Sequence, residues 1–246
     1  MINPLQTRYG SLDCIVVDGG ETPDVAVVLC HGYGAPGSDL AGLSAAWIQM
    51  LGDQADRFRF VFPAAPHTLA DLGMPDGRAW WPLNMARMME AIEANAFDEL
   101  HQHEPTGIVS SREALCETID LVKQELGGAS TTLALGGFSQ GAMLTMDTAL
   151  RGTIEPPQLL IQFSGTLICE AQWRAAIGRL ADTKVYQSHG EVDPILPFAS
   201  AQRLHQLLVD GGVDAEFHAF RGPHTIDQDS IEKTTLALQE LICNAQ

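Results

Sequence analysis

Short apolar runs alternate with longer stretches of helical periodicity along this chain, and that alternation is the strongest constraint on its fold. Two of the runs, residues 25–30 and 159–163, are largely apolar and rich in branched side chains. Such runs are typical of parallel strands that helices cover on both faces. Further strands are predicted at residues 14–17, 58–62, 132–136, 184–188 and 214–220. The sequence therefore predicts an α/β fold, with a mostly parallel central sheet of about seven or eight strands flanked by helices.

Helices are predicted between these runs, where apolar residues recur at helical spacing. One lies around residues 40–51, and another around residues 204–208 ends before the glycine pair 211–212. The tetrapeptide Asp-Ser-Ile-Glu at residues 229–232 resembles a capping box. We therefore expect the last helix to begin there.

A methionine-rich stretch from residue 85 to about 103 also carries apolar residues at helical spacing. We expect residues 84–108 to form a helical cap insertion within the domain. It could be a fixed helix, a contact in a homodimer, or a mobile lid over an acyl pocket, where flexible methionine side chains would suit varied chains. The sequence leaves these alternatives open.

The size and charge of the chain limit its organisation and its partners. Its 246 residues match one α/β domain, residues 1–246, which no proline- or serine-rich linker divides. The net charge of −17 argues against binding to nucleic acid or to an anionic membrane surface. No apolar run approaches the ~18 residues needed to span a bilayer, so we expect no stable membrane insertion.

The cysteines and the first residues favour a cytoplasmic protein. The five cysteines are odd in number and scattered, without Cys-x-x-Cys spacing, which favours free thiols over disulfides or a zinc site. No basic segment leads into an apolar one near the start, so we expect no signal peptide. Whether the protein is a monomer or a homodimer stays open.

The segment Gly137-Phe138-Ser139-Gln140-Gly141 gives the first indication of chemistry, because it lies between a predicted strand and a helical pattern. A Gly-x-Ser-x-Gly at such a turn is the nucleophile elbow of serine hydrolases. The glycines permit a sharp turn, and the serine is exposed above the sheet. Ser139 is therefore the candidate nucleophile.

A serine hydroxyl needs a base that accepts its proton and an acid that orients the base. In elbow-type enzymes, the acid and then the histidine follow the serine along the chain. Asp193 and His224 occur in this order, each in a turn just after a predicted strand. Sites of parallel sheets lie at these carboxyl ends, so Asp193 and His224 are the candidate acid and base.

Other histidines and carboxylates fit these roles less well. His218 lies within a predicted strand and is expected to face the sheet, and His205 lies in mid-helix. Asp182 and Asp214 lie at the wrong ends of their strands. Asp227 is close to the candidate base in sequence, but we expect it to cap the helix that follows.

An oxyanion hole is the second requirement of this chemistry. One donor is the backbone N–H of the residue after the nucleophile, Gln140. The other should come from the loop after residues 25–30, where His31-Gly32 lets the backbone turn inward, so the N–H of Tyr33 is the candidate. We expect His31 to hold this loop by hydrogen bonds and not to act as the base. Since amides stabilise the charge, no metal and no organic cofactor is expected.

Three further residues are candidates for the substrate pocket. Trp80 and Trp81 either form pocket walls or lie in the core, since a large aromatic side chain serves in both places. His67 lies in a proline-rich loop near the predicted mouth of the site and could also line the pocket.

Four motifs, spanning roughly residues 27–226, carry a family resemblance. In chain order they are Leu29-Cys30-His31-Gly32-Tyr33-Gly34, Phe62-Pro63-Ala64-Ala65-Pro66, Gly137-Phe138-Ser139-Gln140-Gly141, and His189-Gly190-Glu191-Val192-Asp193 with Gly222-Pro223-His224. With them the chain resembles the carboxylesterase/phospholipase family of α/β-hydrolases, which includes the acyl-protein thioesterases. The resemblance implies an α/β-hydrolase fold without a cofactor. It also implies Ser139 as nucleophile, Asp193 as acid, His224 as base, and Tyr33 and Gln140 as oxyanion donors.

The resemblance further implies hydrolysis of carboxylic esters with short to medium acyl chains through an acyl-enzyme, and we predict this reaction on a small-molecule acyl ester. The alternative is an acyl-protein thioesterase or lysophospholipase acting on longer chains. An alternative of another class is a non-catalytic binding protein on a hydrolase fold. The chain departs from the family pattern at residues 32–35 and 78–83, around the expected pocket, so the substrate stays open.

Overall fold

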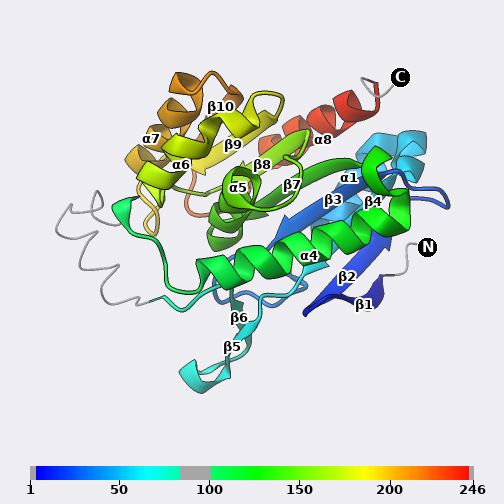
Figure 1. Cartoon of the computed structure of the whole chain (residues 1–246), viewed down its shortest axis with the longest axis horizontal. Helices are drawn as coiled ribbons and strands as arrows, with labels where there is room; N and C mark the ends of the chain where they lie inside the picture. The colour runs from blue at the N-terminus through cyan, green and yellow to red at the C-terminus, as the bar shows by residue number, and fades with distance from the viewer. Residues whose placement is uncertain (1–3, 84–100, 244–246) are drawn as a thin grey trace.

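A computed structural model describes residues 4–83 and 101–243 (Figure 1). Its centre is an eight-stranded sheet with the strand order β1-β2-β4-β3-β7-β8-β9-β10. These strands are β1 (Leu5–Tyr9), β2 (Leu12–Asp18), β3 (Val25–Cys30), β4 (Phe58–Pro63), β7 (Thr132–Phe138), β8 (Leu159–Phe163), β9 (Lys184–Gly190) and β10 (Asp214–Phe220). β2 is antiparallel to both of its neighbours, and the other neighbouring pairs are parallel. The predicted mostly parallel sheet is confirmed.

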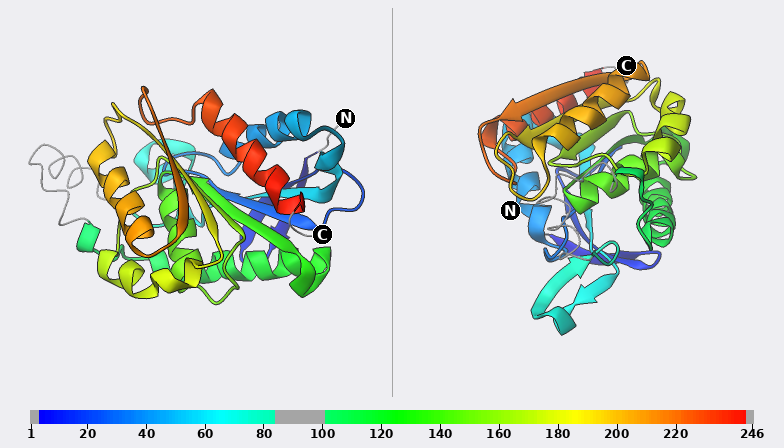
Figure 2. Two further views of the ribbon diagram at one scale, coloured as in Figure 1. Left: turned by 90° about the horizontal axis from the view of Figure 1, so that it is seen from above. Right: turned by 90° about the vertical axis from the view of Figure 1, so that its left-hand side faces the viewer.

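Helices cover both faces of this sheet, as predicted (Figure 2). One layer contains α1 (Gly42–Leu51) and α8 (Gln228–Cys243), and the other contains α4 (Ile108–Leu126), α5 (Gln140–Arg151), α6 (Glu170–Ala176) and α7 (Phe198–Asp210). Short 3-10 helices are η1 (Asp39–Ala41), η2 (Gly52–Arg57), η3 (Ala70–Leu72), η4 (Gly128–Ser130) and η5 (Ile177–Leu180). Each layer buries its own apolar cluster against the sheet. Because the strands from β4 to β10 in the sheet order are parallel, their carboxyl ends lie at one edge of the sheet.

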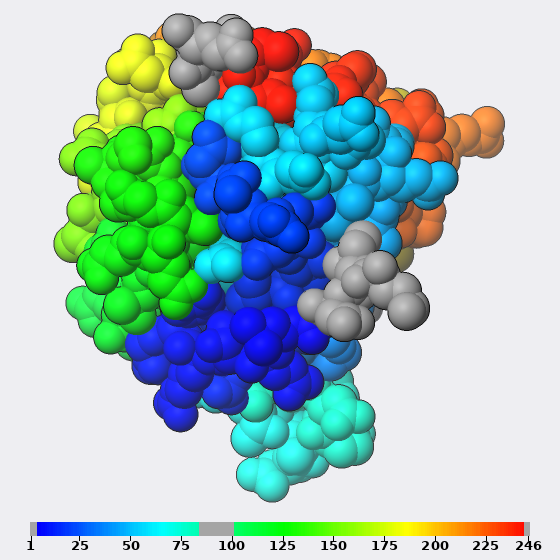
Figure 3. All heavy atoms as spheres, turned by 90° about the vertical axis from the view of Figure 1, so that its right-hand side faces the viewer, coloured from blue at the N-terminus to red at the C-terminus, as the bar shows by residue number. Residues whose placement is uncertain are grey.

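The predicted strands all form, but three further strands were not predicted from the sequence. β1 is a mostly exposed edge strand with polar residues, so it lacks the apolar run of a covered strand. β5 (His67–Leu69) and β6 (Met74–Ala79) pair in a separate hairpin that projects from the rest of the surface (Figure 3). Its proline, aspartate and glycine at residues 75–77 are typical of turns, not strands.

The prediction of a capping box at residues 229–232 is wrong, because α8 begins earlier, at Gln228. The N-terminal cap is Asp227, whose Oδ1 accepts a hydrogen bond from the Ser230 N–H at 3.1 Å. The expectation that Asp227 caps this helix is therefore confirmed.

The predicted cap insertion at residues 84–108 falls largely outside the described residues. Its described end, residues 101–107, leads into α4. All five cysteines are free, as predicted, and four of them are buried. Among the helices that the structure describes, none has both the length and the apolar character to cross a membrane.

Candidate active site

Ser139 occupies the turn between β7 and α5, with φ at 55° and ψ at −117°. An L-residue in such a sparsely populated conformation costs about 1–3 kcal/mol, and strain of this kind is concentrated at functional sites. Glycines on both sides allow the turn. A Cβ on Gly141 would lie 2.0 Å from the Cys30 carbonyl oxygen, and one on Gly137 would lie 2.6 Å from the same oxygen. The motif therefore brings α5 against the end of β3 and exposes the serine.

The end of β8 links this elbow to the loop that carries His224. The Ser139 N–H donates to the Phe163 carbonyl at 2.9 Å. The next residue, Ser164, donates from its hydroxyl to the carbonyl of Thr225 at 3.0 Å. Consecutive residues of one strand end thus hold the candidate nucleophile and the neighbour of the candidate base.

His224 and Asp193 lie together, as the sequence predicted. His224 Nδ1 is 2.6 Å from Asp193 Oδ2, and the two residues come from the loops after β10 and β9. The imidazole also packs on the Phe138 ring, with centroids 4.7 Å apart. Ser139 and His224 line the same cavity. The structure therefore brings the three candidate residues to one end of the sheet.

The Asp193 carboxylate is fully buried and heavily hydrogen-bonded. Its Oδ1 accepts from the N–H groups of Ile195 at 2.8 Å and Leu196 at 2.9 Å. Its Oδ2 is also 3.2 Å from His189 Nε2. Burial raises the pKa of Asp193, but the hydrogen bonds from His189, His224 and Leu196 outweigh it and hold the pKa well below its usual range. The group is therefore an anion that can orient His224.

His189 was not assigned a role from the sequence, although it lies at the penultimate position of β9, within a motif noted there. Its side chain is fully buried, and its Nε2 lies 2.9 Å from the Leu196 carbonyl oxygen as well as near Asp193. It therefore fixes the turn that carries the acid. The sequence signal that could have identified His189 is its position four residues before Asp193.

The two candidate oxyanion amides, of Tyr33 and Gln140, belong to residues that line the same cavity as Ser139. Within residues 4–83 and 101–243, neither N–H has a hydrogen-bond acceptor. The Gln140 N–H opens α5, and the first N–H groups of a helix have no partner inside it. Gly32 keeps the two segments close, because a Cβ there would lie 3.3 Å from the Ser139 Cβ.

His31 holds the loop before Tyr33, as predicted. The Ala65 N–H donates to His31 Nε2 at 3.1 Å, so the ring proton is on Nδ1, which donates to the Gly32 carbonyl at 2.8 Å. Burial lowers the pKa of His31, which keeps the imidazole neutral in these roles.

The cavity beside Ser139 has a volume of about 390 Å³. Its walls are mainly apolar and include Trp81, Leu83, Met143, Leu167, Ile168 and Leu196. Of the predicted pocket residues, Trp81 therefore lies in the wall. Trp80 is fully buried and is not among the residues that line the cavity. His67 is exposed on β5, in the projecting hairpin, so its prediction as a pocket residue does not agree with the structure.

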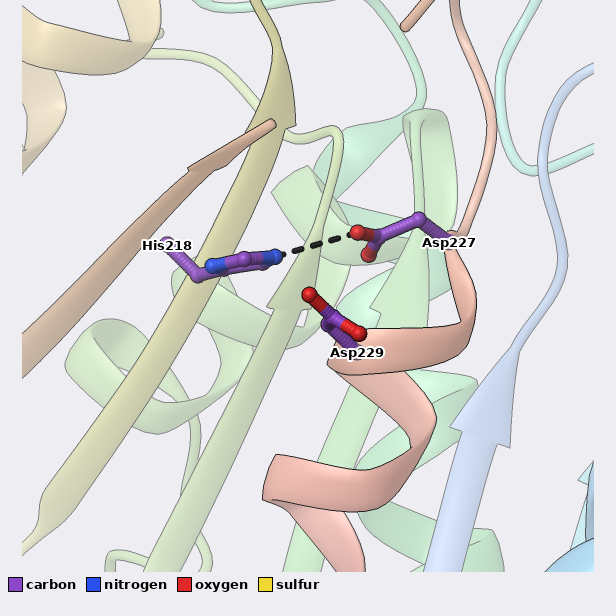
Figure 4. Close-up of side chains that lie close together, drawn as sticks. All are labelled: His218, Asp227 and Asp229. Atoms are coloured by element: carbon purple, nitrogen blue, oxygen red, sulfur yellow. Dashed lines mark hydrogen bonds and ion pairs between the residues drawn. The ribbon is translucent and has the colours of Figure 1, made fainter. Parts of the chain in front are cut away.

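One group among the described residues could hold a metal ion: His218, Asp227 and Asp229 (Figure 4). His218 Nε2 is 3.1 Å from Asp227 Oδ2, while the other oxygen of Asp227 caps α8. The pair joins the two ends of the loop that carries His224. Helix capping and pairing with the histidine account for this geometry, so we assign the cluster a structural role.

Comparison with known proteins places the chain in a family. A family model described as phospholipase/carboxylesterase matches residues 12–242. The chain belongs to the phospholipase/carboxylesterase family. This membership makes it an α/β-hydrolase and an enzyme of the esterase or thioesterase type, in agreement with the predicted fold and reaction class.

Individual proteins are similar to this chain over most of their length. Acyl-protein thioesterase 1 of Mycosarcoma maydis is 28% identical over 244 residues, which cover 91% of this chain and 93% of that protein. Acyl-protein thioesterase 1 of Saccharomyces cerevisiae is 27% identical over 230 residues, with coverage of 84% and 88%. The crystal structure of esterase PE8 is 27% identical, with a TM-score of 0.72 and coverage of 98% and 99%.

Proposed function

We propose that this enzyme hydrolyses carboxylic esters of short to medium acyl chains, with Ser139 as nucleophile, His224 as base and Asp193 as acid. One observation carries the proposal. His224 and Ser139 line one cavity. His224 is hydrogen-bonded to a buried carboxylate at 2.6 Å, and Ser139 lies in a strained elbow. This combination is what activation of a serine hydroxyl requires.

In the proposed reaction, His224 Nε2 accepts the proton of the Ser139 hydroxyl as its oxygen attacks the acyl carbonyl. The N–H groups of Tyr33 and Gln140 stabilise the oxyanion of the tetrahedral intermediate. His224 then gives its proton to the leaving alcohol. Water, activated by the same histidine, releases the acid and restores the serine. Asp193 holds the imidazole with its proton on Nδ1 throughout.

The cavity supports the substrate class. Its mainly apolar walls fit an acyl chain, and its 390 Å³ is near the small end of the ~300–1,000 Å³ found for ligand pockets. A small-molecule ester with a short to medium acyl group fits within this volume.

A second candidate substrate is the acyl thioester of a protein. The names of the two curated relatives, both acyl-protein thioesterases, favour it. The chemical steps would be the same, with a thiol as leaving group. The two candidate substrates differ in the length of the acyl chain and in the leaving group at the mouth of the cavity, which is a small alcohol in one and a protein thiol in the other.

The test is hydrolysis of p-nitrophenyl esters from acetate to palmitate by the wild type and by Ser139→Ala. We expect a maximum at short or medium chains, and a loss of about 10⁴-fold in kcat for the variant. Ser110→Ala, an exposed serine on α4, is the matched control and should keep full activity. Near-normal turnover by Ser139→Ala would refute the assignment.

The same series distinguishes the alternatives. A maximum at palmitate, together with release of palmitate from an S-acylated peptide, would favour the thioesterase. Absence both of turnover and of labelling by a fluorophosphonate would favour a binding protein on the hydrolase fold.

A further inference from the structure

The two proposed oxyanion amides lie on separate parts of the chain, and one short segment is hydrogen-bonded to both parts. Tyr33 follows β3, and Gln140 opens α5. Residues 78–81, at the end of β6 and just beyond it, contact both the Tyr33 loop and Gln140. We call residues 78–81 the bracket.

On one side the bracket holds the loop that contains Tyr33. The Gly34 N–H donates to the Arg78 carbonyl at 2.9 Å, and the Arg78 N–H donates to the Ala35 carbonyl at 3.1 Å. The Trp80 indole N–H donates to the His31 carbonyl at 2.9 Å. The loop is therefore bonded on both sides of its proposed oxyanion amide.

On the other side the bracket holds the start of α5 through the side chain of Gln140. Gln140 Oε1 accepts from the Trp80 N–H at 2.9 Å, and its Nε2 donates to the Trp81 carbonyl at 2.9 Å. The Trp80 carbonyl accepts from the Ser111 hydroxyl. Every polar group of Trp80 is thus bonded, each to a different element, and the residue is fully buried.

From these contacts we infer that Trp80 and the side-chain amide of Gln140 are positioning residues, which set the placement of the Tyr33 N–H relative to the Gln140 N–H. The inference rests on the proposed function, since it requires that these amides stabilise an oxyanion. Both donors must lie about 2.7–3.1 Å from one oxygen atom. A displacement of ~1 Å caused by a change outside the reacting groups can lower the rate about 10²-fold.

The test is Trp80→Phe, which keeps an aromatic ring but lacks the indole N–H. We expect kcat on the best p-nitrophenyl ester to fall by about 10-fold or more, with KM within about 2-fold. The inhibition constant of an alkylboronic acid should rise by a similar factor, because its adduct with Ser139 is a tetrahedral anion. The inhibition constant of an alcohol with the same alkyl chain should not change, because it occupies the cavity without forming an anion.

Trp47→Phe is the matched control. Trp47 is fully buried too, and its indole N–H donates to Thr234 Oγ1 at 3.2 Å between α1 and α8. Trp47→Phe should lower the free energy of unfolding by about as much as Trp80→Phe does, while its kcat stays within about 2-fold of the wild type. Gln140→Met removes the other side of the bracket but keeps the backbone amide, so it should show the same signature as Trp80→Phe. If Trp80→Phe does not fold, Gln140→Met alone tests the inference.

The inference is overturned if the Trp80 and Gln140 variants match Trp47→Phe in kcat and in boronic acid inhibition. It is also overturned if KM and the alcohol inhibition constant rise as much as kcat falls, because the bracket would then shape the cavity only. Either result beside an inactive Ser139→Ala leaves the proposed function intact. An active Ser139→Ala would refute the proposed function itself.

Discussion

At the scale of single residues, the electrostatics of the site depend most on Asp193. Its carboxylate is fully buried, and a buried charge is costly unless it is paired and hydrogen-bonded. Two histidines and two backbone amides supply those partners. The same contacts that stabilise the anion also orient His224, so the charge of Asp193 contributes to both folding and the proposed catalysis.

Asp193→Asn should therefore lower kcat by about 10³–10⁴-fold, because an amide cannot hold the imidazole in the required tautomer. It should also lower the free energy of unfolding by about 2 kcal/mol at neutral pH. The folded pKa of Asp193 is depressed, so its contribution is complete above the unfolded value near pH 4 and is lost as pH falls further. Urea denaturation at several pH values should show the difference shrinking below about pH 4.

The control for this experiment is Asp182→Asn, an exposed carboxylate before β9, which should change neither activity nor the pH profile. A stability difference between wild type and Asp193→Asn that persists unchanged in acid would contradict the assigned charge.

Sequence order predicted the candidate residues better than it predicted their surroundings. Ser139, Asp193 and His224 could be found because each follows a recognisable strand. The contacts of Trp80 could not be found, because its partners are 31 to 60 residues away in sequence. The prediction that His67 lines the pocket was wrong for a related reason, because the hairpin that carries His67 away from the cavity has no apolar pattern in the sequence.

At the scale of elements, the elbow depends on how closely α5 approaches β3. The apolar runs predicted the covered strands, since burial on both faces demands them. They could not predict the polar edge strand β1, nor the separation between a helix and a strand. That separation is set by Gly141, where a Cβ would lie 2.0 Å from the Cys30 carbonyl oxygen.

Gly141→Ala should accordingly lower the free energy of unfolding by about 1–3 kcal/mol and displace the serine, with loss of activity. The matched control is Gly42→Ala at the start of α1, where a Cβ would meet nothing within 4 Å. Because alanine is the better helix former, that change should be neutral or stabilising by up to about 1 kcal/mol. Urea denaturation and ester hydrolysis measure both effects. Equal stability of the two variants would show that α5 can move away from β3 freely.

At the scale of the whole molecule, the thiols report how tightly the two helix layers enclose the sheet. Cys14, Cys30, Cys116 and Cys169 are buried, whereas Cys243 is exposed at the end of α8. Burial raises the pKa of Cys14 and of Cys169 to about 12, and that of Cys30 well above its usual value. Because the thiolate is the reactive form, the thiols of Cys14, Cys30 and Cys169 are protected from reagents both by their burial and by their protonation.

In the native protein at neutral pH, one thiol of the five should therefore react rapidly with 5,5′-dithiobis(2-nitrobenzoate), and Cys243→Ser should abolish that phase. The remaining thiols lie on β2, β3, α4 and beside α6, so they become accessible only when the sheet separates from its helices. Their reaction should accelerate with urea in parallel with the loss of esterase activity, because both require the same opening. Rapid reaction of a second thiol in the absence of urea, with activity intact, would show that one layer opens independently of the site.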